Sequence, residues 1–323
     1  MTIKLCVSCD QNVEEHEVKV DFIVPLYRSS EHIRDLFERV NTLQSDFHVP
    51  VQLILVLDGP DLATESMIRE HRDFLTCSVR TIVLSRNFGV GPALLAGLSE
   101  SDSCVSMCFG SDLQEPEFLF NKFLEIIWLN NADIALGNRI SREDPVLSKI
   151  GAAFFWFIYR KFINHEVPKG GFDVFALNKK ARMALTSLTE LNTSITSQIG
   201  WIGFRQIYVP FNREIRKIGK SSWTLKRKIK LFSDSIFGFT FLPITAITMI
   251  GFFLTAIFLL ISIGISVAVL LGWVKVEGYA TLTLLIGVGN SATIFCIGLL
   301  GGYISRTFDN SKRRPTFIVL RKY

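Results

Sequence analysis

Two long stretches of the sequence contain no charged residue. Charged residues make up 20% of the 323 positions, yet none lies between Ser235 and Val274 or between Gly278 and Ser305. Each stretch exceeds the roughly 20 apolar residues that a helix needs to cross a bilayer. Because only a short connector separates them, the sequence predicts a hairpin of two transmembrane helices, at about 243–271 and 279–304.

Signatures of several other protein classes are also absent. No GxGxxG fingerprint follows the first apolar run and no Walker A sequence occurs, so NAD- and ATP-binding folds gain no support. The first ten residues lack the apolar core of a signal peptide. Six cysteines without a paired framework are typical of a reducing compartment, and the single CxxC formed by Cys6 and Cys9 is a weak metal signal.

Basic residues gather immediately before the first uncharged stretch. Residues 213–230 hold eight Lys or Arg and one Glu, within a net charge of +5. This placement favours anionic lipid or phosphate over nucleic acid as the partner. Apolar residues at Leu225, Ile229, Phe232 and Ile236 predict a basic amphipathic helix within a juxtamembrane segment 213–240, lying in the membrane interface. A core-packing helix would show the same apolar stripe.

The positions of the basic residues also predict an orientation. Arg227 and Lys228 precede the first predicted span, and Arg313 and Arg314 follow the second. By the positive-inside rule, the large N-terminal part and both termini lie in the cytoplasm. The sequence thus predicts an N-terminal tail 1–17, a cytosolic domain 18–212 and a cytosolic C-terminal tail 306–323 around the membrane part.

The cytosolic domain alternates short apolar runs with helical patterns. Strands are predicted at 19–24, 51–57, 79–84 and 105–109, and helices at 30–43, 62–71 and 92–98. This order predicts an α/β domain with a mostly parallel sheet.

Polar loops follow the four predicted strands: Pro25–Tyr27, Asp58–Asp61, Ser85–Gly89 and Gly110–Gln114. In parallel sheets ligands bind beyond the carboxyl ends of the strands, so these loops are expected to form one site. Asp112 and Gln114 offer hard oxygen ligands suited to Mg²⁺ or Mn²⁺. A lone Asp after a strand also serves as a turn former or helix cap.

A series of motifs runs through the chain in a fixed order. They are Val24-Pro25-Leu26-Tyr27, Leu84 to Gly89, Asp112-Leu113-Gln114 with Pro116, Gly137-Asn138-Arg139 with Arg142, Arg216 with Gly219 and Ser221, and Leu299 to Ser305. With these motifs the chain resembles the inverting family-two glycosyltransferases of GT-A fold. Within them it resembles the polyprenyl-phosphate branch of bactoprenol glucosyltransferases, dolichyl-phosphate mannose synthases and undecaprenyl-phosphate aminoarabinose-type transferases.

The resemblance implies a GT-A nucleotide-sugar-binding domain with a Rossmann-like mixed sheet, followed by the interfacial amphipathic helix and the two-helix hairpin. It implies inverting transfer of a sugar from a nucleotide sugar, UDP-glucose or similar, to polyprenyl (undecaprenyl) phosphate at the cytoplasmic face of the cell inner membrane. The product would serve cell-envelope glycan modification. The resemblance further implies a homo-oligomer, a tetramer.

The resemblance also assigns residues. Pro25 and Tyr27 would frame the base, Asp58 would contact the nucleoside, and Ser111 would line the same site. Asp112 and Gln114 would hold the metal ion on the diphosphate. The candidates for gripping the donor diphosphate and the lipid phosphate are Arg139, Arg142 and Arg216, with Ser221 beside the lipid phosphate. Asp112, Arg139 and Arg216 would be the catalytic residues; for each arginine the alternative is a solvated surface charge.

The chain departs from the family pattern at four positions. Gly110 and Leu57 replace acidic residues, Ser29 replaces a Glu, and Ser222 replaces a Lys. These losses leave open an alternative function, that of a catalytically inactive binding or scaffold subunit. A processive polysaccharide synthase is disfavoured because no Gln-x-x-Arg-Trp motif is present.

Overall fold

The structure, a computed structural model, describes residues 19–47, 49–139, 172–190, 194–213 and 278–323, with scattered positions between 245 and 273. Its contacts divide the chain into two compact units. The first comprises Met1–Leu231 together with Pro315–Tyr323, and the second comprises Phe232–Arg314. The predicted tail 1–17 and almost all of the predicted amphipathic segment 213–240 lie outside the described residues.

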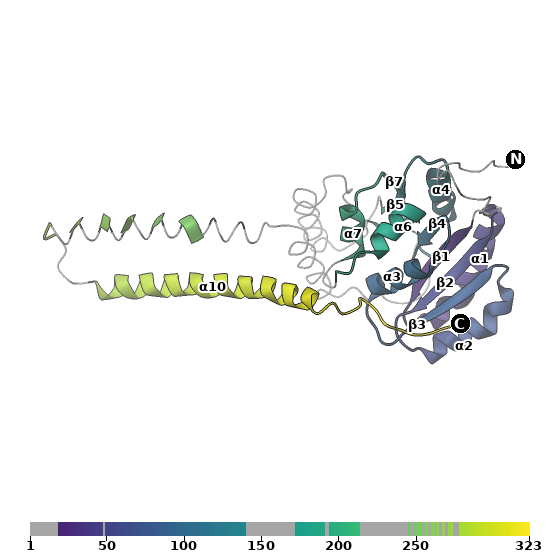
Figure 1. Cartoon of the computed structure of the whole chain (residues 1–323), viewed down its shortest axis with the longest axis horizontal. Coiled ribbons are helices and arrows are strands. Elements are labelled where there is room, and N and C mark those ends of the chain that lie inside the picture. The colour runs from purple at the N-terminus through teal and green to yellow at the C-terminus, as the bar shows by residue number, and fades with distance from the viewer. Residues whose placement is uncertain are drawn as a thin grey trace. The chain divides into compact units, whose positions relative to one another are not determined.

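The first unit is built on a mixed sheet (Figure 1). Its described strands lie in the order β7-β5-β6-β4-β1-β2-β3-β8. The strands are β1 (Val20–Leu26), β2 (Val51–Leu57), β3 (Ser78–Leu84), β4 (Val105–Cys108), β5 (Ile134–Arg139), β6 (Phe172–Asn178), β7 (Gln206–Phe211) and β8 (Val319–Lys322). Strands β4, β1, β2 and β3 run parallel, whereas β6 is antiparallel to both β4 and β5. The predicted Rossmann-like mixed sheet is confirmed and is consistent with a GT-A fold.

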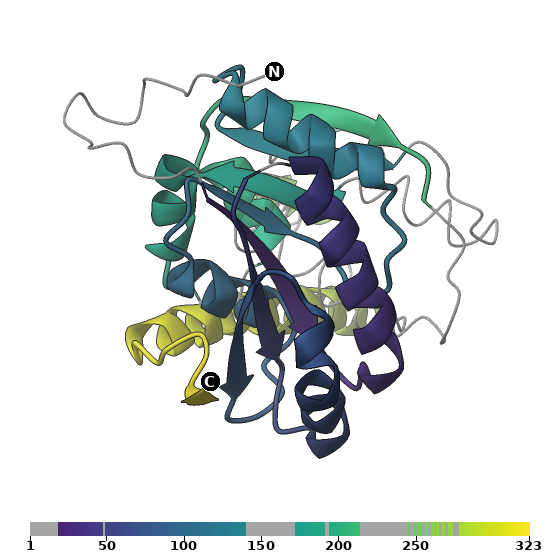
Figure 2. The same ribbon diagram turned by 90° about the vertical axis from the view of Figure 1, so that its right-hand side faces the viewer.

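Helices cover both faces of this sheet (Figure 2). One face packs against α1 (Ile33–Phe47), α2 (Leu62–His71) and α4 (Glu117–Trp128), and the other against α3 (Val90–Glu100), α6 (Lys179–Thr186) and α7 (Ile195–Trp201). Two short 3-10 turns, Ser30–His32 and Arg72–Phe74, flank α1 and α2. Because β1 is covered on both sides, it is apolar apart from Asp21 and shows no alternation of buried and exposed residues.

Two residues show how the sequence sets this packing. A Cβ at Gly97 of α3 would collide with the side chain of Ile23, so glycine allows the helix to approach the sheet closely. Pro25 stands in a central strand, where proline normally removes a ladder hydrogen bond. The Ile23 carbonyl accepts a hydrogen bond from the Phe109 N–H, so Ile23 faces β4. Pro25, two residues further along the strand, faces the same side, but it lies beyond the last paired residue of β4. The missing N–H of Pro25 therefore breaks no β1–β4 bond.

The described part of the second unit is dominated by α10 (Tyr279–Ser311). This helix begins at the first residue of the second predicted span and continues past its expected end at 304. Among the described residues, no helix combines the length and the hydropathy required for a membrane span.

The C-terminal tail contains a strand that the sequence analysis did not predict. Strand β8 pairs antiparallel with β3 and closes that edge of the sheet. Its register places Arg321 opposite Val83 and Lys322 opposite Ile82. The last residues of the chain are thus part of the first unit, although the second unit precedes them in sequence.

Candidate active site

A pocket of about 270 Å³ lies at the carboxyl ends of β1, β2 and β3. Leu26, Tyr27 and Arg28 line it from the end of β1, residues 58–61 from the end of β2, and Asn87 from the loop after β3. The structure thus brings together three of the four polar loops that the sequence pattern placed at this edge. Pro25 lies within β1 and is not among the residues that line the pocket.

The carboxylate of Asp58 joins two of these loops. Its Oδ1 accepts a hydrogen bond from the Phe88 N–H at 2.6 Å, and its Oδ2 accepts one from the Gly89 N–H at 2.9 Å. Burial raises the pKa of Asp58, and the two backbone hydrogen bonds and nearby Arg86 oppose that rise. Asp58 is only 5% exposed, so its carboxylate acts as a clamp that holds the loop after β3 beside the pocket.

The clamp works because Gly59 lets the two loops touch. Its φ of 103° is a left-handed conformation that L side chains rarely adopt. A Cβ at this position would also lie 3.0 Å from the Asn87 backbone nitrogen. Any side chain at 59 would therefore push the loops apart.

The loop after β1 presents one exposed aromatic ring and one buried hydroxyl. Tyr27 is 50% exposed, and the guanidinium of Arg28 lies 5.5 Å from the centre of its ring. Ser29 is buried and its Oγ lies 3.3 Å from the Ser111 Oγ in the loop after β4. The Ser29 backbone N–H donates to the Thr64 Oγ1 at 3.2 Å. Ser29, which replaces a Glu of the family pattern, therefore links the loop after β1 to the loop after β4 and to the first turn of α2.

The loop after β4 holds the predicted metal ligands. Asp112 accepts an ion-pair hydrogen bond from the Arg213 guanidinium, at 3.0 Å on Oδ2. A Cβ at Gly110 would lie 2.9 Å from the Asp112 Oδ1, so the side chain of Asp112 occupies space that glycine leaves free. Gln114 is 8% exposed. No group of three or more His, Cys, Asp or Glu side chains suited to a metal ion occurs in the part of the chain that the structure describes.

A second carboxyl group, which the sequence analysis missed, lies beside Asp112. Glu115 is 3% exposed, and its Oε2 has no hydrogen-bond partner among the described residues. Burial and the charge of Asp112 raise the pKa of Glu115 to about 7, while Arg213 and Arg139 act against that rise. Its position directly after Gln114 was the only available signal.

Of the predicted arginines, the structure describes Arg139. It ends β5 and forms an ion pair with Asp173 of β6, with its Nε donating to the Asp173 Oδ1 at 3.1 Å. Arg142, Arg216 and Ser221 lie outside the described residues. Arg213 and Asp173 were not predicted as site residues. Arg213 belonged to a basic cluster assigned to anionic lipid or phosphate, and no motif marked Asp173.

Comparison with known proteins places this arrangement in a family. The profile described as "Glycosyl transferase family 2" matches residues 21–184. An uncharacterized glycosyltransferase of Synechocystis sp. is 25% identical over 304 residues, covering 94% of this chain and 95% of the relative. The bactoprenol glucosyl transferase of Shigella phage SfV is 27% identical over 306 residues, covering 94% of this chain and 98% of the relative.

Solved structures match more weakly. The mannosyltransferase from Pyrobaculum calidifontis in complex with GDP-Man and Mn²⁺ is 16% identical, with a TM-score of 0.42. The match covers 62% of this chain and 58% of the mannosyltransferase.

Proposed function

This chain belongs to glycosyl transferase family 2, and from that premise we propose that it transfers a sugar from a nucleotide sugar to polyprenyl phosphate at a membrane. The observation that carries the proposal is the reach of the similarity to bactoprenol glucosyl transferases. The family profile ends at residue 184, whereas the alignment with the phage SfV enzyme spans 94% of this chain and 98% of that enzyme. The shared part therefore includes most of the C-terminal region that follows the family profile.

The donor nucleotide is assigned to the pocket at the ends of β1, β2 and β3. Tyr27 offers a half-exposed ring against which a base can stack, and Pro25 shapes the strand end before it. The neighbouring backbone is held in place by the Asp58 clamp and the Ser29–Ser111 contact. UDP-glucose or a similar nucleotide sugar is the proposed donor.

The diphosphate of that donor is assigned to the loop after β4. Asp112 and Gln114 supply one carboxylate and one amide oxygen, a set that suits a Mg²⁺ or Mn²⁺ ion whose other ligands are phosphate oxygens and water. Such an ion would neutralise charge on the departing nucleoside diphosphate. Arg213 already pairs with Asp112, and Arg139 lies close enough to Glu115 to affect its pKa. The loop and the arginines beside it therefore offer both acidic and basic partners for a metal-bound diphosphate.

The acceptor phosphate needs to be positioned more than it needs a base to remove a proton. A lipid phosphate is an anion near neutral pH, so its oxygen can attack the anomeric carbon in line while the bond to the nucleoside diphosphate breaks. The configuration at that carbon inverts. Arginine suits the acceptor phosphate because its planar fork binds oxygens in pairs. We assign this role to Arg139, Arg142 and Arg216, with Ser221 beside them.

The membrane part is proposed as a hairpin of helices at about 243–271 and 279–304, preceded by the interfacial segment 213–240. A helix of the length of α10 extends about 50 Å, which exceeds the hydrocarbon thickness. Large apolar side chains on it are more than half exposed: Leu282, Ile286, Ile297 and Ile304. We place the catalytic unit and both termini on the cytoplasmic side of the cell inner membrane.

The test is a transfer assay with the purified full chain in detergent. The chain is incubated with undecaprenyl phosphate, Mg²⁺ or Mn²⁺ and a panel of UDP- and GDP-sugars, and glycolipid is detected by mass spectrometry. Asp112→Asn should lower the rate about 10²- to 10³-fold, as the loss of a group that stabilises transition-state charge does. Asp102→Asn is the matched control, because Asp102 is 72% exposed and lies before β4 rather than after it.

The assay also separates the proposal from the alternative of a binding or scaffold subunit. Metal-dependent glycolipid that disappears in Asp112→Asn and persists in Asp102→Asn supports transfer and identifies the donor. Absence of product across the panel, together with absence of nucleotide binding, would favour the inactive subunit.

A further inference from the structure

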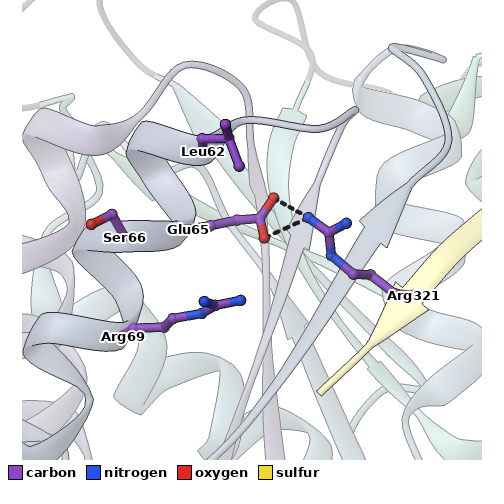
Figure 3. A pocket seen from close by; sticks show the side chains of 5 residues that line it. All are labelled: Leu62, Glu65, Ser66, Arg69 and Arg321. Atoms are coloured by element: carbon purple, nitrogen blue, oxygen red, sulfur yellow. Dashed lines mark hydrogen bonds and ion pairs between the residues drawn. The ribbon is translucent and has the colours of Figure 1, made fainter.

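The C-terminal strand β8 contacts two elements that border the donor pocket, helix α2 and the end of β3. A surface hollow of about 570 Å³ is lined by Leu62, Glu65, Ser66 and Arg69 of α2 and by Arg321 of β8. Figure 3 shows these five side chains. In this view the Arg321 guanidinium points across the hollow to the Glu65 carboxylate. The strand is therefore joined to α2 by side chains as well as to β3 by backbone pairing.

The contact between Glu65 and Arg321 is an ion pair between a buried carboxylate and a partly exposed guanidinium. The Arg321 NH2 group donates to both carboxylate oxygens of Glu65 at 2.7 Å, and the Tyr323 hydroxyl adds a third hydrogen bond to Oε2 at 3.3 Å. The side chain of Glu65 is only 4% exposed. A carboxylate at such a depth is costly without a partner, so Arg321 is needed to hold it there.

The helix that carries Glu65 begins in the donor pocket. Asp61, which lines the pocket, caps α2, and its carbonyl accepts the Glu65 N–H at 2.9 Å. Its carboxylate accepts from the Thr64 Oγ1 at 2.6 Å, and Thr64 in turn accepts from the Ser29 N–H. The first turn of α2 thus holds the loops after β1 and β2, and Glu65 fixes that turn to β8.

The same strand also fixes the third pocket loop. The Ile318 carbonyl accepts the Ser85 N–H at 2.9 Å, and Val319 pairs with Leu84 at the end of β3. Ser85 opens the loop that contains Asn87 of the pocket. Strand β8 is therefore attached at the base of the loop after β3 and, through Arg321, to the first turn of α2.

We propose that β8 is a positioning element of the donor pocket and that the Arg321–Glu65 pair is its main side-chain contact. This inference rests on the proposed function in taking the pocket as a nucleotide site. Arg321 and Glu65 touch no substrate in this proposal. They set the distance between the loops after β1, β2 and β3, which determines how well the pocket fits a nucleotide before any chemistry occurs.

The experiment compares four variants of the full chain in detergent: Arg321→Gln, Glu65→Gln, the double variant and Lys322→Gln. Lys322 is the matched control because it lies in the same strand but pairs with Glu100 of α3, at 2.7 Å. Dissociation constants for UDP and GDP are measured calorimetrically with Mn²⁺. The donor KM and kcat are measured with the sugar nucleotide that the transfer assay identifies.

Arg321→Gln should raise the nucleotide Kd and the donor KM about tenfold and leave kcat within about twofold, because the pair acts on binding. It should also lower the melting temperature, since it leaves a buried carboxylate unpaired. The double variant should recover the melting temperature but keep the raised Kd and KM. Lys322→Gln should leave both parameters within about twofold of the wild type, as for surface ion pairs in general.

Wild-type Kd and KM in the double variant would overturn the proposal and reduce the pair to a stability role. An equal rise in Lys322→Gln would overturn the role given to the Arg321–Glu65 pair, because the pair would then affect the pocket no more than another side-chain contact of β8. If the wild type binds a nucleotide but makes no glycolipid, the proposed acceptor fails while Kd still tests the positioning role. If it binds neither nucleotide, both proposals fail.

Discussion

Asp58→Asn distinguishes two roles for the carboxylate at the end of β2. The family resemblance assigns Asp58 to the nucleoside, whereas the structure engages both of its oxygens with the N–H groups of Phe88 and Gly89. An asparagine keeps one carbonyl oxygen, so it can accept only one of these bonds. Its amide group would face the other N–H, where donor meets donor.

The expected loss follows from that geometry. A hydrogen bond to a charged group contributes about 1.5–3 kcal/mol, so losing one of two should lower the free energy of unfolding by roughly 2 kcal/mol. For folded units of this size 1 kcal/mol shifts the melting temperature by about 2–4 °C. The variant without ligand should therefore melt about 4–8 °C below the wild type, and its affinity for UDP or GDP should also fall.

Thermal unfolding without nucleotide, followed by calorimetric titration with UDP and GDP, measures both effects. Asp61→Asn is the control, because Asp61 also lines the pocket and caps α2, a role in which asparagine serves as well as aspartate. Unchanged melting of ligand-free Asp58→Asn, with weaker nucleotide binding, would refute the clamp and restore a direct contact with the nucleoside.

Three further predictions concern the core and the loop after β4. The raised pKa of Glu115, about 7 against an ordinary 4.5, means that wild-type stability falls as pH rises between these values. In metal-free buffer Glu115→Gln should remove that fall, so that its free energy of unfolding above pH 7 is about 3 kcal/mol higher than that of the wild type. Denaturant unfolding at several pH values measures this difference. Gly110→Asp should displace the Asp112 side chain, lowering the melting temperature without metal and tightening Mn²⁺ binding in calorimetry. Gly97→Ala should destabilise the fold by about 1–3 kcal/mol in denaturant unfolding, whereas Gly91→Ala, with open space around the added methyl, should not.

The parallel half of the sheet was predictable because each strand there is an apolar run bounded by polar loops. The predicted helix 62–71 matches α2, and the strand at 51–57 matches β2. Strand β8 was not predictable, because only its pairing with β3 gives a four-residue segment with Arg321 and Lys322 a strand conformation. When all the hydrogen bonds of a strand are made with distant parts of the chain, its local sequence gives little signal that it will form.

The sequence predicted which loops form the site, but it predicted fewer of the contacts between their residues. Tyr27 and Asp58 were expected at a common pocket, and the structure places them there. The carboxylate of Asp58, however, bonds backbone donors about 30 positions further along the chain, which no local pattern reveals. Arg213 and Asp173 were missed for the same reason, since each is defined by a partner distant in sequence, Asp112 and Arg139 respectively.

The two missing acids of the family pattern have different structural consequences. Leu57 is 1% exposed at the end of β2, so the position belongs to the core, and an aspartate there would be a buried charge. Gly110 instead leaves room that the Asp112 side chain fills, and Glu115 lies near enough for the two carboxyl charges to interact. The loop after β4 therefore still contains two acids, Asp112 and Glu115. The absence of an acid at 110 therefore leaves a pair of carboxyl groups in the loop beside the proposed diphosphate site.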